Sequence, residues 1–139
     1  MKYLIIFLIG VSLYSCMDSP FATYDSNLLF SADSIVSPGV NSFESPLLFG
    51  GSVKLNFSLK TNVPIPPEDS SSVRANIQLI CKDPYMMDTI FTSRGNACNE
   101  TYSCTLDLPA MSELYGSVYA DTSNGHNYSL KMYNISIRK

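Results

Sequence analysis

The chain has 139 residues, 15% of them charged, and its acidic side chains outnumber the basic ones by twelve to nine. A mild acidic excess without any run of Lys or Arg gives no reason to expect nucleic acid, so we predict no such partner. The length suits one domain with a real hydrophobic core.

The first fifteen residues have the pattern of a secretory signal peptide. Lys2 gives a positive start, and an apolar run from Leu4 to Leu13 follows it. A helix of that length rises only about 15 Å, half of a bilayer core of about 30 Å, so the run is too short to span a membrane. We therefore predict a signal peptide over residues 1–15 and a protein that is secreted or resides in the endolysosomal lumen.

Cys16 gives an alternative localisation. Leu13-Tyr14-Ser15-Cys16 resembles a bacterial lipobox, in which the cysteine becomes the lipidated N-terminus after cleavage. The protein would then be a membrane-anchored lipoprotein. A eukaryotic-type signal would instead be cut nearby, and Cys16 would be lost or free to form a disulfide.

Asn-X-Ser/Thr sequons favour the eukaryotic secretory route. They begin at Asn56, Asn99, Asn127 and Asn134. Asn56 and Asn134 fall on the polar phase of predicted strands, and the other two fall in or beside turns. A glycan at any of these positions would avoid the core.

The first half of the chain alternates between loops and strands. Residues 16–27 are polar and aperiodic and predict a flexible lead, and the single domain covers residues 28–139. Its first, short strand is expected within Leu28 to Val36. Pro and Gly punctuate residues 37–51, which predicts an extended loop.

Two stretches alternate strictly between apolar and polar residues, which predicts strands with one buried and one exposed face. These are Val53 to Leu59 and Val73 to Cys81. In the second, Arg74, Asn76 and Gln78 point away from the core. The Pro-rich residues 62–72 between the two strands form a connection.

The second half predicts four more strands. Residues 89–92 form a weak one, and residues 102–108 form a stronger one that ends at Pro109. The last two, residues 115–121 and 128–138, are joined through Asn124-Gly125. This dipeptide is a strong hairpin signal, so these two strands are expected to pair.

The last strand changes its apolar phase. Leu130 and Met132 set an even phase, whereas Tyr133, Ile135 and Ile137 set an odd one. Such a change needs either a bulge near Met132-Tyr133 or burial on both faces.

Nowhere do apolar residues recur at helical spacing for more than about a turn. Short strands with Pro and Gly punctuation predict an all-β fold, a two-sheet antiparallel β-sandwich. We expect six to eight strands in an immunoglobulin-like arrangement.

The cysteines suggest a disulfide. Cys98 and Cys104 bracket five residues, and their bond is the pairing we favour. Cys81 is a rival partner for Cys104, because both fall on the apolar phase of their strands, and spacing does not decide between them. With one histidine and no second cysteine two to four residues away from any of these, we predict no metal site.

Catalytic signals are weak throughout. The one histidine, His126, lies beside the predicted turn, and no nucleophile elbow or Gly-rich phosphate loop is present. We predict that the protein is not an enzyme and has no cofactor. Tyr85, Met86 and Met87 are candidates for an adaptable apolar rim at the mouth of a pocket, or they plug the end of the sandwich.

From Thr101 onward the chain resembles the ML family of lipid-recognition domains, which includes the Niemann-Pick type C secreted sterol carrier and phosphatidylglycerol/phosphatidylinositol transfer proteins. The likeness rests on Thr101 to Pro109, Ser112-Glu113, the turn at Asn124-Gly125 and the closing strand. The family carries a closely spaced cysteine pair, which Cys98 and Cys104 could represent. This chain lacks the family's cysteine in the last hairpin.

The resemblance implies a carrier that holds a lipid tail or sterol between its sheets. Two sheets normally pack about 10 Å apart, and splaying them at one end leaves an apolar slot. Each CH₂ buried there contributes about 0.8 kcal/mol. The expected lining residues share the inward strand phase: Val53, Leu55, Phe57, Ile77, Leu79, Leu106, Leu108 and Val118.

The alternative is an immunoglobulin-like binding or adhesion module with a closed core, secreted or lipid-anchored. It would bind a protein partner through its loops or a sheet face. Tyr115 and Tyr119 are expected to point outward and would suit such a contact surface.

Overall fold

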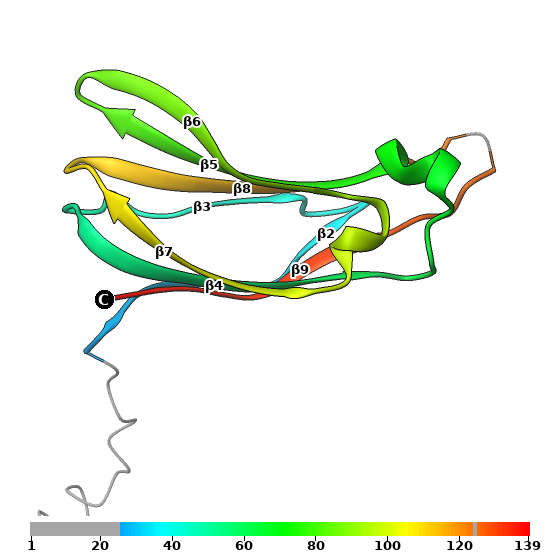
Figure 1. The fold of residues 1–139 in the computed structure, drawn as a ribbon, viewed down its shortest axis with the longest axis horizontal. Helices are drawn as coiled ribbons and strands as arrows, with labels where there is room; N and C mark the ends of the chain where they lie inside the picture. Colours follow the sequence, from blue (N-terminus) through cyan, green and yellow to red (C-terminus); the bar gives the residue numbers. More distant parts are fainter. Residues whose placement is uncertain (1–25, 124) are drawn as a thin grey trace, which may run out of the picture.

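Nine strands in the described part of the chain form two antiparallel sheets that pack face to face (Figure 1). The computed structural model describes residues 26–123 and 125–139. The predicted signal peptide, Cys16, most of the lead and Asn124 lie outside these ranges. The predicted two-sheet antiparallel β-sandwich is confirmed.

The first sheet, sheet A, has the strand order β1-β9-β4-β7, and β2 also pairs with β9. Its strands are β1 (Leu28–Ala32), β2 (Ile35–Ser37), β4 (Gly51–Thr61), β7 (Thr101–Leu108) and β9 (Leu130–Arg138). Sheet B has the order β3-β8-β5-β6. Its strands are β3 (Ser42–Glu44), β5 (Val73–Lys82), β6 (Tyr85–Arg94) and β8 (Ser112–Ala120).

This order is that of a jelly roll, in which each sheet alternates between strands from the two ends of the chain. The first strand pairs with the last, and β3 pairs with β8. An immunoglobulin domain orders its strands ABED and CFG. The immunoglobulin-like comparison therefore extends to the two packed sheets and not to the strand order.

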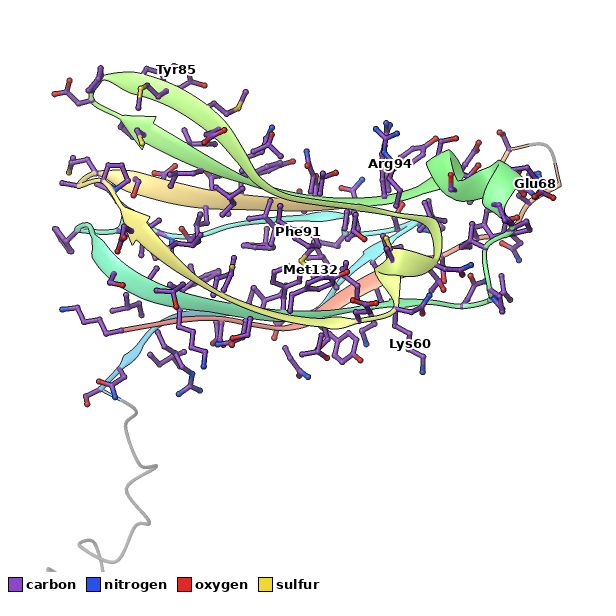
Figure 2. The ribbon with its side chains drawn as sticks, viewed as in Figure 1. Lys60, Glu68, Tyr85, Phe91, Arg94 and Met132 are labelled. Carbon is purple, nitrogen blue, oxygen red and sulfur yellow. The ribbon has the colours of Figure 1, made fainter. Side chains whose placement is uncertain are left out.

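The strict alternation read from the sequence is what builds the core. In β4, Val53, Leu55 and Phe57 are at most 3% exposed, whereas Lys54 on the other face is exposed. Phe57 contacts the rings of Phe91 and Tyr102, with centroids 4.8 and 5.2 Å away. Phe91 and Met132 lie between the sheets in Figure 2.

Two expectations about the strands are wrong. The predicted hairpin does not form, because β8 belongs to sheet B and β9 to sheet A. The chain crosses between the sheets there, and β9 pairs with β4 and β1 instead. The described strands also exceed the expected six to eight, because the first strand is split into β1 and β2 and the presumed loop contains β3.

The bulge in the last strand is confirmed, one to two residues beyond the predicted position. Ser58 pairs with Tyr133, and Asn56 pairs with Ser136, so β9 holds one extra residue at this point. Asn134 has a φ of 54°, the left-handed conformation that Asn tolerates better than most residues. Its insertion lets Met132 and Ile135 both face the core.

Two 3₁₀ helices close one end of the sandwich, η1 (Pro67–Ser72) and η2 (Gly95–Cys98). Within the described ranges, no helix is long and apolar enough to cross a membrane.

Candidate functional site

The predicted slot residues come together between the sheets. Six of the eight are at most 6% exposed and belong to one continuous hydrophobic core, and Leu79 and Leu106 are half-buried against it. The inward phase read from the sequence is therefore right for all of them.

Tyr85, Met86 and Met87 lie at the tip of the β5–β6 hairpin. Tyr85 is 70% exposed, Met86 is 56% exposed and Met87 is 57% exposed. Figure 2 shows Tyr85 on the outer side of this tip. The three residues begin β6, which is longer than the strand predicted over residues 89–92.

The predicted disulfide between Cys98 and Cys104 is absent, and Cys81 is free as well. Cys98 is fully buried in η2, and its thiol donates a hydrogen bond to Ser93 Oγ over 3.6 Å. Cys104 is exposed in β7, opposite Leu55. Cys104 lies three residues into the extended strand β7, so the chain does not turn back within the segment as closure of a disulfide with Cys98 requires. Burial raises the pKa of the Cys98 thiol.

The four sequon asparagines differ in their surroundings. Asn127 and Asn134 are exposed, and Asn56 is half-buried on the outer face of β4. Asn99 uses its side-chain amide to bind Thr61: its Nδ2 donates to Thr61 Oγ1 over 2.7 Å. A glycan on Asn99 would have to replace this contact.

His126 forms a small polar cluster with Tyr128 and Asp69 near η1. The rings of His126 and Tyr128 stack 5.1 Å apart, and the Tyr128 hydroxyl donates to Asp69 Oδ2 over 2.6 Å. This hydrogen bond, together with burial, raises the pKa of Tyr128 to about 12. Asp69 Oδ2 lies 3.6 Å from His126 Nδ1. The cluster fastens the chain just before β9 to η1.

The outer face of sheet B carries a groove of about 520 Å³. Two rows of side chains run across β8, β5 and β6 there. The arginine row consists of Tyr119, Arg74 and Arg94, and the amide row consists of Ser117, Asn76 and Thr92. Both rows line the groove, together with Asn41 and Thr89.

A bulge in β6 completes the groove. Ile77 pairs with Phe91 and Gln78 pairs with Thr89, so Ile90 is an extra residue in β6. Thr89 and Thr92 are three residues apart and would face opposite sides of a regular strand. The bulge turns both toward the groove.

Within the arginine row, the Arg74 guanidinium lies over the Tyr119 ring, 4.6 Å from its centroid. Tyr119 is 42% exposed and Tyr115 is half-buried on the same face. The predicted outward orientation of both tyrosines is confirmed. The contact holds the Arg74 side chain flat across the sheet.

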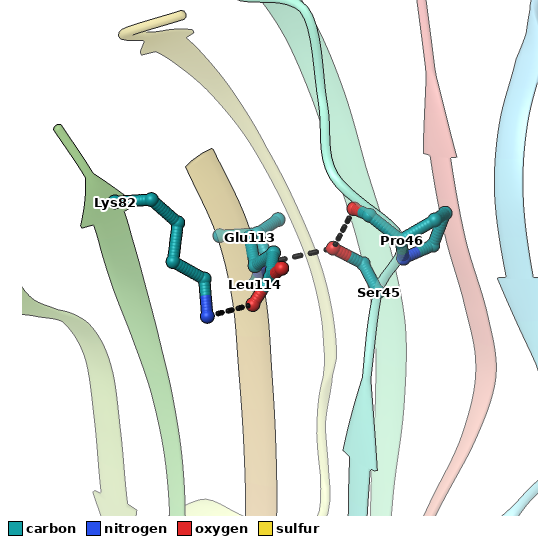
Figure 3. A network of polar contacts seen from close by, with 5 residues as sticks. All are labelled: Ser45, Pro46, Lys82, Glu113 and Leu114. Atoms are coloured by element: carbon teal, nitrogen blue, oxygen red, sulfur yellow. Dashed lines mark hydrogen bonds and ion pairs between the residues drawn. The ribbon is translucent and has the colours of Figure 1, made fainter. Parts of the chain in front are cut away.

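The opposite end of the same face has a different chemistry. Lys82 Nζ lies 2.8 Å from Glu113 Oε2, and this ion pair lowers the pKa of Glu113 and raises that of Lys82 (Figure 3). Beside this pair, the Leu114 amide donates to Ser45 Oγ over 2.9 Å, which fastens the chain after β3 to β8. Glu44 also interacts with Lys82 and Glu113, so two carboxylates and one lysine gather at this end.

The sequence pattern identified Arg74 and Asn76 as outward-facing but not as a site. The strand register sets them beside Arg94, Thr92 and Ser117, and register cannot be obtained from the alternation alone. The cross-strand neighbours come from residues up to 45 positions away.

No protein-family model matches the chain, and no curated protein is detectably similar to it in sequence. Among solved structures, it is similar to variants of a family 29 carbohydrate-binding module. One has an arginine replaced by alanine, with 11% identity, a TM-score of 0.34, and coverage of 70% of this chain and 61% of the other. Another, complexed with mannohexaose, has 11% identity, a TM-score of 0.36, and coverage of 80% and 73%. The chain thus spans less than two thirds of the first of these, and at these values we take nothing about function from the likeness.

Proposed function

We propose that the protein is a non-catalytic binding module that holds a saccharide on the outer face of sheet B. The observation that carries this proposal is the groove of about 520 Å³ across β8, β5 and β6. A volume of this order suits a small ligand or a few sugar residues.

The chemistry of the groove suits a ligand rich in hydroxyl groups. Asn, Ser and Thr side chains each donate and accept hydrogen bonds, so the amide row can meet hydroxyl groups in either orientation. The Tyr119 ring at the next row offers an apolar face with a polar tip. Asn76 and Ser117 are half-buried at the floor of the groove.

An extended peptide fits this face less well. Peptides that add to a sheet need unpaired backbone groups at its edge. The groove crosses β8, β5 and β6; β8 and β5 are already paired on both sides, and of these three strands β6 alone has a free edge. Recognition over β8 and β5 must come from side chains, and those of the two rows are polar except for the Tyr119 ring.

The test is isothermal titration calorimetry against a panel of defined neutral and acidic oligosaccharides. We expect binding to at least one, and we expect Asn76→Ala to weaken it about 3- to 10-fold, the value of one or two hydrogen bonds. The matched control is Asn56→Ala, which removes a half-buried asparagine from the outer face of the other sheet and should leave affinity unchanged. A panel without any binder, or equal losses in the two variants, would contradict the proposal.

The lipid-carrier hypothesis remains a second candidate because of one observation. On the side where β6 and β7 are the outer strands, inward-facing Leu79 and Leu106 are only half-buried, and Cys104 is exposed. A lipid tail could enter there if the β5–β6 hairpin moved away from β7. Native mass spectrometry of the purified protein tests this: a lipid adduct of a few hundred daltons that leaves on denaturation supports it, and a bare chain opposes it.

A further inference from the structure

We infer that the saccharide bound on this face is acidic, and that Arg74 and Arg94 bind its sulfate or carboxylate group. This inference rests on the proposed function and specifies the ligand class. It starts from an arrangement that is unfavourable in the free protein.

Arg74 and Arg94 are direct cross-strand partners on β5 and β6. Cα atoms of such partners lie about 4.5–5.5 Å apart, and like charges placed opposite one another destabilise a sheet. Neither arginine forms an ion pair with any residue in the described ranges. Two guanidinium groups therefore share one end of the groove without a counter-ion from the protein.

The carboxylates of the same face do not neutralise this pair. None lines the groove. Glu44 pairs with Tyr115, two rows away along the strands, and interacts with Lys82 and Glu113. Glu113 lies three rows away along the strands, about 20 Å, and is paired with Lys82. That distance exceeds a Debye length of about 10 Å.

Among the described residues, the carboxylates near the closer end form no ion pair with either arginine, although Asp121 lies only two residues beyond Tyr119 in the chain. Asp121 accepts a hydrogen bond from the Ser123 amide over 2.8 Å, and Asp69 binds Tyr128. Figure 2 shows Arg94 projecting outward from sheet B, with Glu68 on η1 farther out at the same end of the molecule. Within the described residues, the arginine row thus has no carboxylate within ion-pairing distance.

A bound anion would turn the repulsion into attraction. The guanidinium group offers donors in a planar fork that matches the oxygen atoms of a carboxylate or sulfate. Arg74 is already held over Tyr119, so less side-chain freedom is lost on binding. The anionic group would lie over the arginine row, and the hydroxyl groups of the sugar would lie over the amide row.

Charge favours a saccharide over a nucleic acid as the anion. The chain has a formal net charge of −3, and only two cationic side chains line the groove. Nucleic acid binding depends on many phosphate contacts, which such a surface does not offer.

The test compares three hexasaccharides by calorimetry: neutral chitohexaose, hyaluronan with carboxylates, and chondroitin sulfate with both carboxylates and sulfates. At 50 mM NaCl we expect an acidic hexasaccharide to bind at least 10-fold more tightly than chitohexaose. The preference should shrink at 200 mM NaCl. The difference between hyaluronan and chondroitin sulfate identifies which group the arginines prefer.

Arg74→Gln and Arg94→Gln should each weaken binding of the preferred acidic hexasaccharide 5-fold or more and change chitohexaose binding less than 2-fold. The control is Lys60→Gln, because Lys60 is an exposed cation on the outer face of sheet A. Thermal melts check the folding of each variant, and we expect the arginine variants to melt at or above the wild-type temperature because a like-charge pair is removed. Arg94 lies on the outer strand β6, so its variant keeps the test usable if Arg74→Gln does not fold.

Equal binding of neutral and acidic hexasaccharides, with arginine variants like wild type, overturns this inference and leaves the proposed function standing. Tighter binding of single-stranded hexauridylate than of either acidic hexasaccharide also overturns it. If no oligosaccharide of the wider panel binds, the proposed function fails and the inference fails with it.

Discussion

At the scale of single residues, Gly116 shows how closely the Phe43 ring packs on the neighbouring strand of sheet B. Phe43 of β3 covers the Gly116 backbone of β8, and a Cβ added at Gly116 would overlap the Phe43 ring. Phe43 itself is 7% exposed and stacks on Phe30, with ring centroids 6.0 Å apart. The ring therefore has little room to move aside.

We predict that Gly116→Ala lowers the free energy of unfolding by about 1–3 kcal/mol, the usual cost of overpacking a core. Urea denaturation measures it. A second substitution, Phe43→Leu, should recover part of the loss when combined with Gly116→Ala, so that the double variant is more stable than the sum of the single effects implies. Strictly additive effects would show that the two residues do not compete for the same space.

The hydrogen bond between Tyr128 and Asp69 predicts a change in stability at high pH. The pKa of Tyr128 is raised from an ordinary value of 10.0 to about 12 in the folded protein. A raised pKa means that the folded state holds the proton more tightly than the unfolded state. The protonated Tyr128 hydroxyl therefore contributes its full share to the free energy of unfolding below pH 10, and this share is lost as the pH rises through about 12. The Tyr128→Phe variant lacks the hydroxyl group, so its stability does not include this pH-dependent contribution.

Urea midpoints at pH 8, 10 and 11.5 check this expectation. Wild type should lose stability relative to Tyr128→Phe as the pH rises, with the change confined to the range above 10. A constant difference between the two proteins across these pH values would show that the hydroxyl titrates normally.

At the scale of elements, the two bulges differ in how far the sequence predicts them. The bulge in β9 leaves a clear mark, because inward residues change from Met132 to Ile135 across an odd spacing. The bulge in β6 leaves none: residues 85–92 mix polar and apolar side chains on both faces, since this hairpin extends beyond the core and is largely exposed. Because neither face of this hairpin is buried, its sequence shows no apolar–polar alternation that a bulge could interrupt.

The failed hairpin has a related cause. Asn124-Gly125 is a local turn signal, but pairing between strands depends on which edges are free. In this jelly roll, β9 lies between β1 and β4, and β8 lies between β3 and β5. Both are central strands with no free edge for each other, a non-local fact that a dipeptide does not encode.

The bulge residue Asn134 gives a prediction at this scale. Replacing it with valine places a β-branched side chain at a φ of 54° and should destabilise the protein by about 1–2 kcal/mol. Asn134→Gly should stay within about 0.5 kcal/mol of wild type, because glycine adopts this conformation freely. Both variants are compared in protein from a bacterial host, so that a glycan on Asn134 does not contribute. Equal stability of the two variants would mean that the bulge relaxes or moves along β9.

At the scale of the whole molecule, the sandwich has a firm end and a looser end. The groove rows lie toward η1 and η2, where Gly95 packs against Ser70. In Figure 1 the β5–β6 hairpin splays away from β7 at the opposite end. The core could be predicted from the alternation in β4, β5 and β7. The difference in firmness between the two ends could not be predicted, because it depends on how far β6 extends past its neighbours.

This difference predicts the pattern of amide hydrogen exchange. Amides in the central strands β4, β5, β8 and β9 should exchange most slowly, because they are buried and paired on both sides. Amides at the hairpin tip, from Tyr85 to Asp88, should exchange at least 100-fold faster than those of Leu55 and Ile77, because the tip has little buried apolar surface. Nuclear magnetic resonance at neutral pH measures both sets in one sample. Tip amides as slow as the central ones would contradict the predicted opening of this end and, with it, the route by which a lipid could enter. A different result is also informative. If amides across the arginine and amide rows exchange slowly while amides at the hairpin tip exchange quickly, the groove is rigid and the far end of the same hairpin is mobile.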